Sequence, residues 1–395
     1  MLQALRILVL AMLIVAVGRP AAVAVEQAPK TEPPEPAAVT ELADKAAAWI
    51  RAQQQDDGSF FAGPMFRLGA TELCAIALLD AGAEADDPAV SKAITYIRQF
   101  VQEDGGIYNP SEGLGNYCTS LGLMALTRAG EPKDSELVQN AQQYLLGLQN
   151  TDEDSINYGG IGYGSRGTGN EDLNNTQHAV QALRETGMSA DHPAMQRALK
   201  FIQRCQNLSS HNDLEWASNT GSGVYSPDSS KAGGSYHGGH NGQKPEVKHE
   251  PAKATGLKGY GTMTYNLITA YIYLQLEPGD PRLDAAMEWV KQNYQFERNP
   301  GLPDERARQG LFYYYTTMAK TWTMAGKDTI ELPDGTVVDW RGDLFKAIAA
   351  RAVPVGEDQV FWINDMDRWA EGIPNLTTAY MLTTLARIED SLTAE

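Results

Sequence analysis

The sequence segment that decides the fold is TELCAIALLDAG at residues 71–82, because two close copies follow it: CTSLGLMALTRAG at 118–130 and NTQHAVQALRETG at 175–187. Each copy is rich in small and apolar residues and ends in glycine, the residue that best adopts the left-handed backbone just beyond a helix. Looser copies follow at 262–276, 312–326 and 375–388. The sequence therefore predicts six related helices, poor in charge, in a repeat architecture.

A second type of helix alternates with the first. Asp or Asp-Pro begins most of its copies, which supplies an N-cap and sometimes a proline at the first helical position. Apolar residues recur three and four positions apart, as at Ile94, Ile97 and Val101, so these helices are amphipathic. The predicted helices of this type are Ala38–Gln54, Asp87–Val101, Asp134–Leu148, Asp191–Cys205, Asp280–Tyr294 and the weaker Asp343–Val353.

Twelve helices of two alternating types can form an open superhelical solenoid or a closed double-layered ring. The number of pairs, six, favours a closed ring. The helices poor in charge are expected inside it, and the helices with one polar face are expected outside. We therefore predict an all-α fold, a single (α/α)6 toroid over residues 39–390. Such a ring has a central cavity at one end, surrounded by the loops at the helix N-termini.

Composition agrees with one large soluble domain. The chain has 395 residues, of which 43% are hydrophobic, and 50 acidic residues against 32 Lys and Arg give a formal net charge of −18. This charge argues against nucleic acid or an anionic lipid surface as the main partner. Cys74, Cys118 and Cys205 each lie within an apolar helical pattern and are expected in the core rather than in disulfides.

The N-terminal residues predict export. Arg6 precedes an apolar run at 7–17, and Ala22-Val23-Ala24 is a small-x-small cleavage pattern, so residues 1–24 are predicted to be a signal peptide. The alternative is an uncleaved anchor, which leaves membrane contact open. Residues 25–38, rich in Pro, Glu and Ala, are predicted to be a flexible tether. We expect a periplasmic or secreted protein.

The amphipathic helices carry a pattern that resembles the QW repeat of squalene-hopene and oxidosqualene cyclases. The fullest copy is Lys45-Ala46-x2-Trp49-Ile50-x3-Gln54-x3-Gly58-x-Phe60, with Phe60 where the family has Trp. A glutamine at a helix end can bind free backbone carbonyls or the next turn while an aromatic ring packs on it. Partial copies occur at 92–106, 144–149, 197–206 and 284–290.

The resemblance covers about residues 40–390 and implies the toroid of terpenoid cyclases and protein prenyltransferases. Segments 261–265, 310–315 and 367–380 look similar to exported, single-domain squalene-cyclase-like proteins of bacteria. For an enzyme, the resemblance implies a terpene cyclase or mutase, an isomerase, or a prenyltransferase. It also implies an apolar, isoprenoid ligand.

Residues 172–176, Asp-Leu-Asn-Asn-Thr, match the Asp-x-Asp-Asp-Thr motif that supplies the proton donor in these cyclases. Asn174 and Asn175 replace the donor and its neighbour, and an amide cannot protonate an alkene. Two interpretations stay open and are compatible. Asp172, Asn174 and His178 form a polar rim that faces a ligand and is the candidate catalytic group, or Asp172 or Asn174 caps a helix.

The sequence does not favour a metal or another cofactor. Prenyltransferases hold zinc with an Asp-x-Cys pair and a distant His, for which Cys118 and His178 are the nearest equivalents. The preferred interpretation is instead that Cys118 is a buried thiol and that His178 is a polar side chain pointing inward. His237, His240 and His249 lie in a long insertion at 207–258. We interpret that insertion as a flexible loop or lid over the cavity mouth rather than a metal site.

Aromatic and acidic residues complete the candidate site. The resemblance implies that Tyr265, Tyr313, Tyr314, Tyr315 and Trp369 line the cavity, with Asn175 and Asp367 also facing the ligand, and that aromatic π faces stabilise carbocations. The alternative for the aromatic residues is helix–helix packing. Among Asp365, Asp367 and Glu371, a structural capping cluster is favoured over a rim acid.

Three classes of function follow. The first is an isoprenoid-acting enzyme or a diverged relative of one. The second is a non-catalytic exported binding or scaffold protein, and the third a carbohydrate-active toroid enzyme. The cavity lining should discriminate between them, since an aromatic apolar funnel favours isoprenoids, facing carboxylates favour sugars, and a filled centre favours a scaffold. The sequence predicts no oligomeric state.

Overall fold

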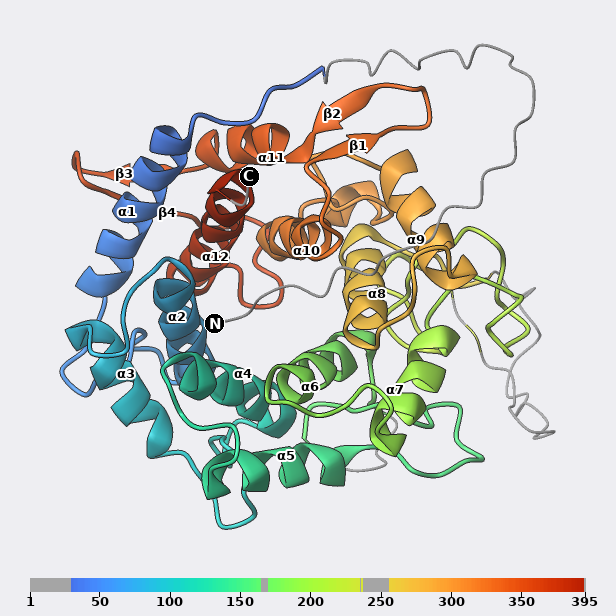
Figure 1. Ribbon diagram of the computed structural model, residues 1–395, viewed down its shortest axis with the longest axis horizontal. Helices are drawn as coiled ribbons and strands as arrows, with labels where there is room; N and C mark the ends of the chain where they lie inside the picture. Colours follow the sequence, from blue (N-terminus) through green and yellow to red (C-terminus); the bar gives the residue numbers. More distant parts are fainter. Residues whose placement is uncertain (1–29, 165–169, 235, 237–255, 394–395) are drawn as a thin grey trace, which may run out of the picture.

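The computed structural model describes residues 30–164, 170–234, 236 and 256–393. The predicted signal peptide at 1–24 and His237, His240 and His249 lie outside these residues. Twelve α-helices dominate the described part, and the chain winds once around a closed double ring (Figure 1). The prediction of an all-α toroid is therefore confirmed.

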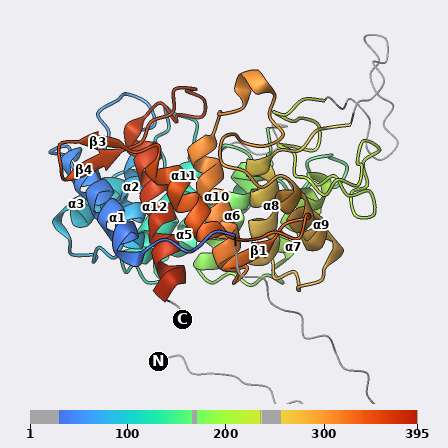
Figure 2. The ribbon, with the colours of Figure 1, turned by 90° about the horizontal axis from the view of Figure 1, so that it is seen from above.

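Six helices form the inner ring, and each packs against the next, with the last closing on the first. Their charge-poor sequences fit this position, because the inner helices are buried on most sides. Seen from its edge, the ring has the inner helices running across its thickness (Figure 2). The inner helices are α2 (Arg67–Asp80), α4 (Gly115–Arg128), α6 (Leu173–Glu185), α8 (Gly261–Tyr273), α10 (Leu311–Met324) and α12 (Pro374–Thr393).

Six amphipathic helices form the outer ring, and each contacts one or two inner helices. Asp87 and Asp280 cap α3 and α9 as predicted, but Ser135, His192 and Asp339 cap α5, α7 and α11 in place of the expected Asp134, Asp191 and Asp343. The outer helices are α1 (Pro36–Ala52), α3 (Pro88–Arg98), α5 (Glu136–Leu148), α7 (Pro193–Arg204), α9 (Pro281–Gln292) and α11 (Trp340–Ala349).

A repeated glutamine ties neighbouring outer helices together. Gln54, Gln149 and Gln206 each follow an outer helix or lie at its end, and each side-chain amide donates to the carbonyl of a loop glycine at 3.0–3.2 Å. The same amide donates at 2.8 Å to a carbonyl in the first turn of the next outer helix, on Ala89, Ala194 or Arg282. Each glutamine thus links the loop that follows its own helix to the first turn of the next outer helix by two backbone acceptors.

A repeated threonine holds five of the six inner helices to the loops that lead into them. Near the start of five inner helices a threonine hydroxyl accepts the backbone N–H of that loop at 2.9–3.1 Å. These bonds fix the loops over the end of the ring where the inner helices begin. The donor and acceptor pairs are Phe60 and Thr71, Ile107 and Thr119, Ile161 and Thr176, Gly223 and Thr264, and Trp362 and Thr378.

A few small elements that the sequence did not predict accompany the twelve helices. Two antiparallel hairpins pair β1 (Thr329–Glu331) with β2 (Val337–Asp339) and β3 (Val353–Val355) with β4 (Gln359–Phe361), and one turn of 3-10 helix, η1, spans Asp304–Arg306. The prediction of a flexible tether is wrong for residues 30–38, which are bound to the rest of the domain. Lys30 N donates to Val337 O at 2.7 Å, and α1 begins at Pro36.

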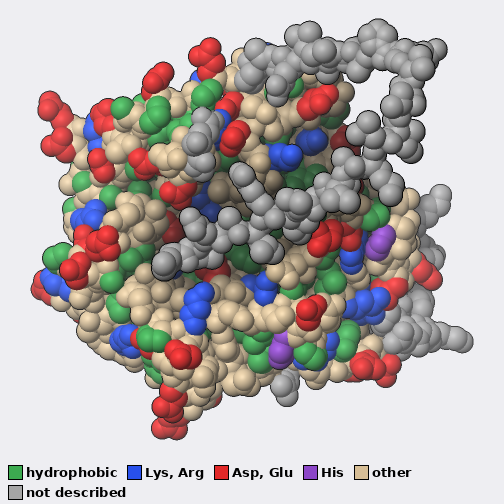
Figure 3. Space-filling model, viewed as in Figure 1, with side chains coloured by type: hydrophobic (Ala, Val, Ile, Leu, Met, Phe, Trp, Pro, Cys, Tyr) green, Lys and Arg blue, Asp and Glu red, His purple; other side chains and the backbone are tan. Residues whose placement is uncertain are grey.

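The first part of the long insertion is also held on the ring. Trp216 is buried and donates its indole N–H to Pro227 O at 2.8 Å, so residues 207–234 are packed rather than free. The three cysteines are buried thiols, as predicted. Among the described residues no helix combines the length and the apolar character needed to cross a membrane. Acidic and basic side chains are intermixed over the face shown in Figure 3.

Candidate functional site

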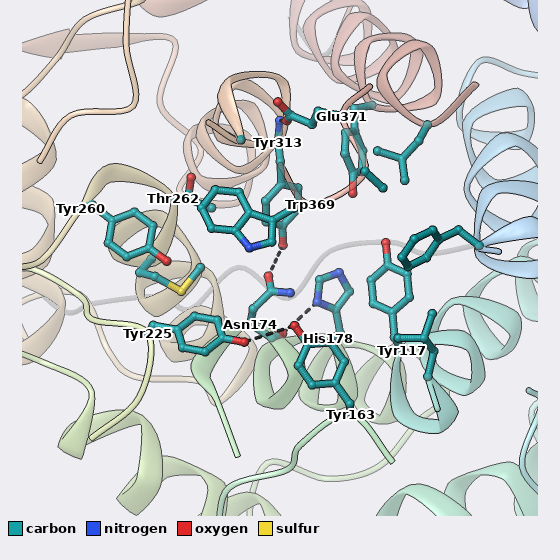
Figure 4. Close-up of a pocket in the computed structure, with 17 residues that line it drawn as sticks. Tyr117, Tyr163, Asn174, His178, Tyr225, Tyr260, Thr262, Tyr313, Trp369 and Glu371 are labelled. Carbon is teal, nitrogen blue, oxygen red and sulfur yellow. Dashed lines mark hydrogen bonds between the residues drawn. The ribbon is translucent and has the colours of Figure 1, made fainter. Parts of the chain in front are cut away.

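The main cavity lies at the end of the ring where the inner helices begin. Its volume is about 300 Å³, at the lower end of the range of small-molecule sites. Residues just before or within the first two turns of all six inner helices form most of its wall, and Tyr163 and Tyr225 reach it from loops (Figure 4). This is the position that the sequence predicts for a cavity in a toroid.

The wall of this cavity is aromatic and largely apolar. Among the described lining residues, eight are Phe, Tyr or Trp, and the polar side chains other than tyrosine are those of Asn174, His178, Thr262 and Glu371. Such a lining can bury an apolar ligand and present π faces to it. The aromatic residues are Phe66, Tyr117, Tyr163, Tyr225, Tyr260, Tyr313, Trp369 and Tyr380.

Asn174 lies on the cavity wall with its amide oxygen doubly bonded. Its Oδ1 accepts from Tyr313 Oη at 2.7 Å and from Asn266 Nδ2 at 3.0 Å, so three inner helices meet at this side chain. The backbone oxygen of Asn174 lies 2.8 Å from His178 Nδ1. Because a carbonyl only accepts, Nδ1 carries the hydrogen. Burial lowers the pKa of His178 to about 4, so this imidazole is neutral at pH 7.

Asp172 takes the second of its two predicted roles. It caps α6, with Oδ1 accepting Asn175 N at 2.9 Å and Oδ2 accepting Asn175 Nδ2 at 2.7 Å. Burial raises its pKa to about 6. Asp172 does not line the cavity, but it bonds the Tyr225 side chain, whose hydroxyl is 3.2 Å from that of Tyr163. The rim interpretation therefore fits Asn174 and His178, and the cap interpretation fits Asp172.

Glu371 is the one carboxylate among the described cavity-lining residues. It is 1% exposed and accepts the Tyr313 backbone N–H at 2.8 Å and Asn364 Nδ2 at 2.6 Å. Glu371 therefore caps the start of α10, as the favoured capping interpretation predicts, and it also faces the cavity. Burial raises the pKa of Glu371 to about 7 even though these hydrogen bonds favour the ionised form.

Backbone strain gathers at the cavity. Three of the four described non-glycine residues with positive φ line it, namely Phe66 (61°), Trp369 (56°) and Ala370 (64°). A Cβ on Gly310 would lie 3.1 Å from the Trp369 ring, so the indole packs closely over that glycine. Left-handed backbone costs about 1–2 kcal/mol for a residue with a Cβ and is concentrated at functional sites.

Besides Asp172, five residues predicted to face the cavity do not line it. Successive helical residues are turned by about 100°, so only Tyr313 of its run faces inward. Tyr314 and Tyr315 turn outward and donate to Gln295 O and Phe296 O, respectively. The others are Tyr265, which packs on Tyr314 and Trp322, Asn175, which bonds Asp172 and Asn116, and Asp367, which accepts the Gly372 N–H.

Most residues of the aromatic wall were not predicted from the sequence. Tyr117 and Tyr260 directly precede predicted inner helices, and this position was a usable signal because the cavity lies at the helix starts. Tyr163 and Tyr225 lie in loops without such a signal. No group of three or more His, Cys, Asp and Glu residues in the described part of the chain is arranged to hold a metal ion.

Comparisons with known proteins agree with this geometry. Residues 69–225 match the family model of the squalene-hopene cyclase C-terminal domain. A squalene-hopene cyclase from Bradyrhizobium diazoefficiens is 26% identical in an alignment of 191 residues that covers 42% of this chain and only 28% of that protein. The predicted resemblance to squalene-hopene cyclases is therefore confirmed over part of the chain, and the chain matches little more than a quarter of its curated relative.

Solved structures show the same fold over nearly the whole chain. The type II terpene cyclase MstE from Scytonema has a TM-score of 0.55 at 12% identity, covering 91% of this chain and 100% of that one. A variant of it, in complex with geranylgeranyl dihydroxybenzoate, has a TM-score of 0.53 at 10% identity, with 90% and 99% covered. An unsaturated glucuronyl hydrolase specific for heparin scores 0.53 at 11% identity, with 91% and 98% covered.

Proposed function

We propose that this protein binds an isoprenoid or similarly apolar ligand in the aromatic cavity, as a diverged relative of the squalene-hopene cyclases. The observation that carries the proposal is the cavity wall, with eight aromatic side chains and a single carboxylate. Burying apolar ligand surface against such a wall contributes about 25 cal/mol per Å². The complex of MstE with a geranylgeranyl substrate supports the ligand class for this fold.

Cyclisation started by proton transfer at Asn174 is not part of this proposal. An amide is no general acid, and the Asn174 amide oxygen is already bonded to Tyr313 and Asn266. The function is therefore binding, with export across a membrane proposed from residues 1–24. N-terminal sequencing of the protein from a cell-envelope or culture fraction tests the export proposal, and an intact residue 1 contradicts cleavage.

A carbohydrate-active function is the second candidate, since a glucuronyl hydrolase shares the fold. Glycoside hydrolysis requires two carboxyl groups about 5–10 Å apart across the scissile bond. Glu371 has no carboxylate opposite it on the described wall. The lining therefore favours the apolar ligand.

The central experiment measures bound and added ligand. The full chain, purified under native conditions, is extracted for mass spectrometry and then titrated with squalene, geranylgeraniol and a polyprenyl phosphate while tryptophan fluorescence and Tm are recorded. We expect one of these apolar compounds to raise Tm, because a ligand at 100 times its Kd stabilises the native state by about 2.7 kcal/mol. No extracted lipid and no shift in Tm with any of the compounds would refute the proposal.

Two variants sharpen this experiment. Trp369→Ala removes an exposed part of the cavity wall and should weaken binding, whereas Trp289→Ala removes an indole on outer helix α9 and should not. Asn174→Asp keeps the oxygen that accepts from Tyr313 and restores an acid at that position. If this variant turns over squalene while the wild type does not, the cavity is competent for cyclisation and lacks only the acid.

A further inference from the structure

A second, smaller cavity lies in the same central channel, on the side where the inner helices end. It has a volume of about 80 Å³ and is separated from the aromatic cavity by His178, Tyr313 and Tyr380, which line both. We call it the lower chamber. The residues that matter for its chemistry are Asp80, Arg128, Gln181, Lys320, Thr383 and Arg387.

The carboxylates near the lower chamber are already used. Arg128 bonds Asp80 at 2.8 Å and Glu185 at 3.3 Å. Glu185 also accepts from Tyr273 Oη at 3.0 Å and Gln181 Nε2 at 2.8 Å. Arg128 is thus shared by two carboxylates, and two further cations, Lys320 and Arg387, line the same chamber.

Lys320 and Arg387 face the chamber without an ion pair among the described residues. The Lys320 side chain is buried, donates to the neutral amide oxygen of Gln181, and lies 5.0 Å from the Tyr273 ring centre. Arg387 Nε is buried and has no hydrogen-bond partner in the described structure. Burial lowers the pKa of Lys320 well below its ordinary value, and repulsion from Arg387 and Arg128 adds to this shift, whereas attraction to Glu185 opposes it.

Cations at helix C-termini are favourable by themselves, and Arg128, the last residue of α4, fits that explanation. This effect is confined to the last turn and does not account for Arg387, which precedes the end of α12 by six residues. Lys320 donates to a side-chain amide rather than to a helix-terminal carbonyl, and Arg387 Nε has no acceptor among the described residues. The chamber therefore presents a buried Lys320 and a partly exposed Arg387, which are attracted by Glu185 and Asp390, respectively, but form no ion pair with a carboxylate of the described residues.

We propose that the lower chamber binds a small oxyanion, a carboxylate or phosphate group, between Lys320 and Arg387. A guanidinium and an ammonium group supply several charge-assisted N–H donors to such an anion. Thr383 adds a hydroxyl on the same wall, and the volume suits a group of a few heavy atoms. The anion would relieve the repulsion between the cations, and this site is independent of the aromatic cavity.

Calorimetric titration of the full chain tests this proposal. Inorganic phosphate and sodium acetate are titrated separately in low-chloride buffer, and the tighter of the two identifies the preferred group. We expect saturable binding of one anion per chain. Lys320→Met and Arg387→Met should each weaken it at least tenfold, and Lys92→Met, which removes an exposed charge on α3, should leave it unchanged.

Two results would overturn the oxyanion site. One is the absence of saturable heat with both anions, and the other is full affinity in both chamber variants. Arg387 is partly exposed, so Arg387→Met carries the test even where Lys320→Met fails to fold. If the oxyanion site is refuted, the proposal of an apolar ligand is unaffected, because its experiment measures binding in the aromatic cavity, which Trp369 lines at the opposite end of the channel.

Discussion

Replacing Glu371 with glutamine should remove a large part of the pH dependence of stability. The pKa of Glu371 is raised to about 7 by burial, against 4.5 for an ordinary glutamate. Between these two values the folded protein holds a proton that the unfolded chain has lost, so stability falls as pH rises. At about 1.4 kcal/mol for each pKa unit, the full loss is about 3 kcal/mol.

The assay is urea denaturation at pH 5 and pH 8, where about 2–3 kcal/mol of this loss should be seen in the wild type. Glu371→Gln should reduce the difference between the two pH values by that amount. It should also cost about 1 kcal/mol at pH 5, because its NH2 group cannot accept from Asn364. Asp365→Asn, which alters an exposed carboxylate paired with Arg308, is the control and should keep the wild-type difference.

A Glu371→Gln protein that loses as much stability between pH 5 and pH 8 as the wild type would refute the reasoning. The same titration bears on ligand binding. Above pH 7 a charged carboxylate faces the aromatic cavity, so the affinity for an apolar ligand should fall in the wild type and stay constant in Glu371→Gln.

Two further predictions concern the scaffold. Ala370→Gly should stabilise the protein by about 0.5–1 kcal/mol, measured as a higher urea midpoint, because the φ of +64° is strained for alanine; a lower midpoint would show that the turn is not strained. Gln149→Ala should lower the free energy of unfolding by about 2–4 kcal/mol, because the carbonyls of Gly159 and Ala194 lose a buried donor. The control Gln139→Ala, on the exposed face, should lower it by less than about 0.5 kcal/mol. Equal losses in the two glutamine variants would show that the tie between outer helices does not stabilise the ring.

The double ring was predictable because each repeat carries its own local signals. Charge-poor helices ending in glycine and amphipathic helices with caps at their starts alternate along the chain, and such patterns depend only on neighbours in sequence. The exact caps were less predictable, since Ser135 and His192 are as close to the helix starts as Asp134 and Asp191. The choice depends on where the chain leaves the preceding inner helix.

The site was predictable in place but not in residue detail. A sequence run such as Tyr313-Tyr314-Tyr315 indicates aromatic character, but the rotation of α10 about its axis decides which ring faces inward. Glu371 reaches the cavity through left-handed backbone at Trp369 and Ala370, a conformation that the side chains of these residues disfavour. Only the packing of the Trp369 ring over Gly310 shows why this turn is tolerated.

His178, Tyr313 and Tyr380 divide the central channel into an aromatic cavity and a charged chamber. The layer is held by ring contacts, with centroids 6.2 Å apart for His178 and Tyr313 and 5.3 Å apart for Tyr313 and Tyr380. Tyr313 is also fixed by its hydrogen bond to Asn174, so the residue at the position of the family's acid supports the partition. Removing the Tyr313 hydroxyl with Tyr313→Phe should therefore loosen the layer and couple the two sites. Oxyanion affinity would then change when the apolar cavity is filled, whereas in the wild type the two titrations should be independent.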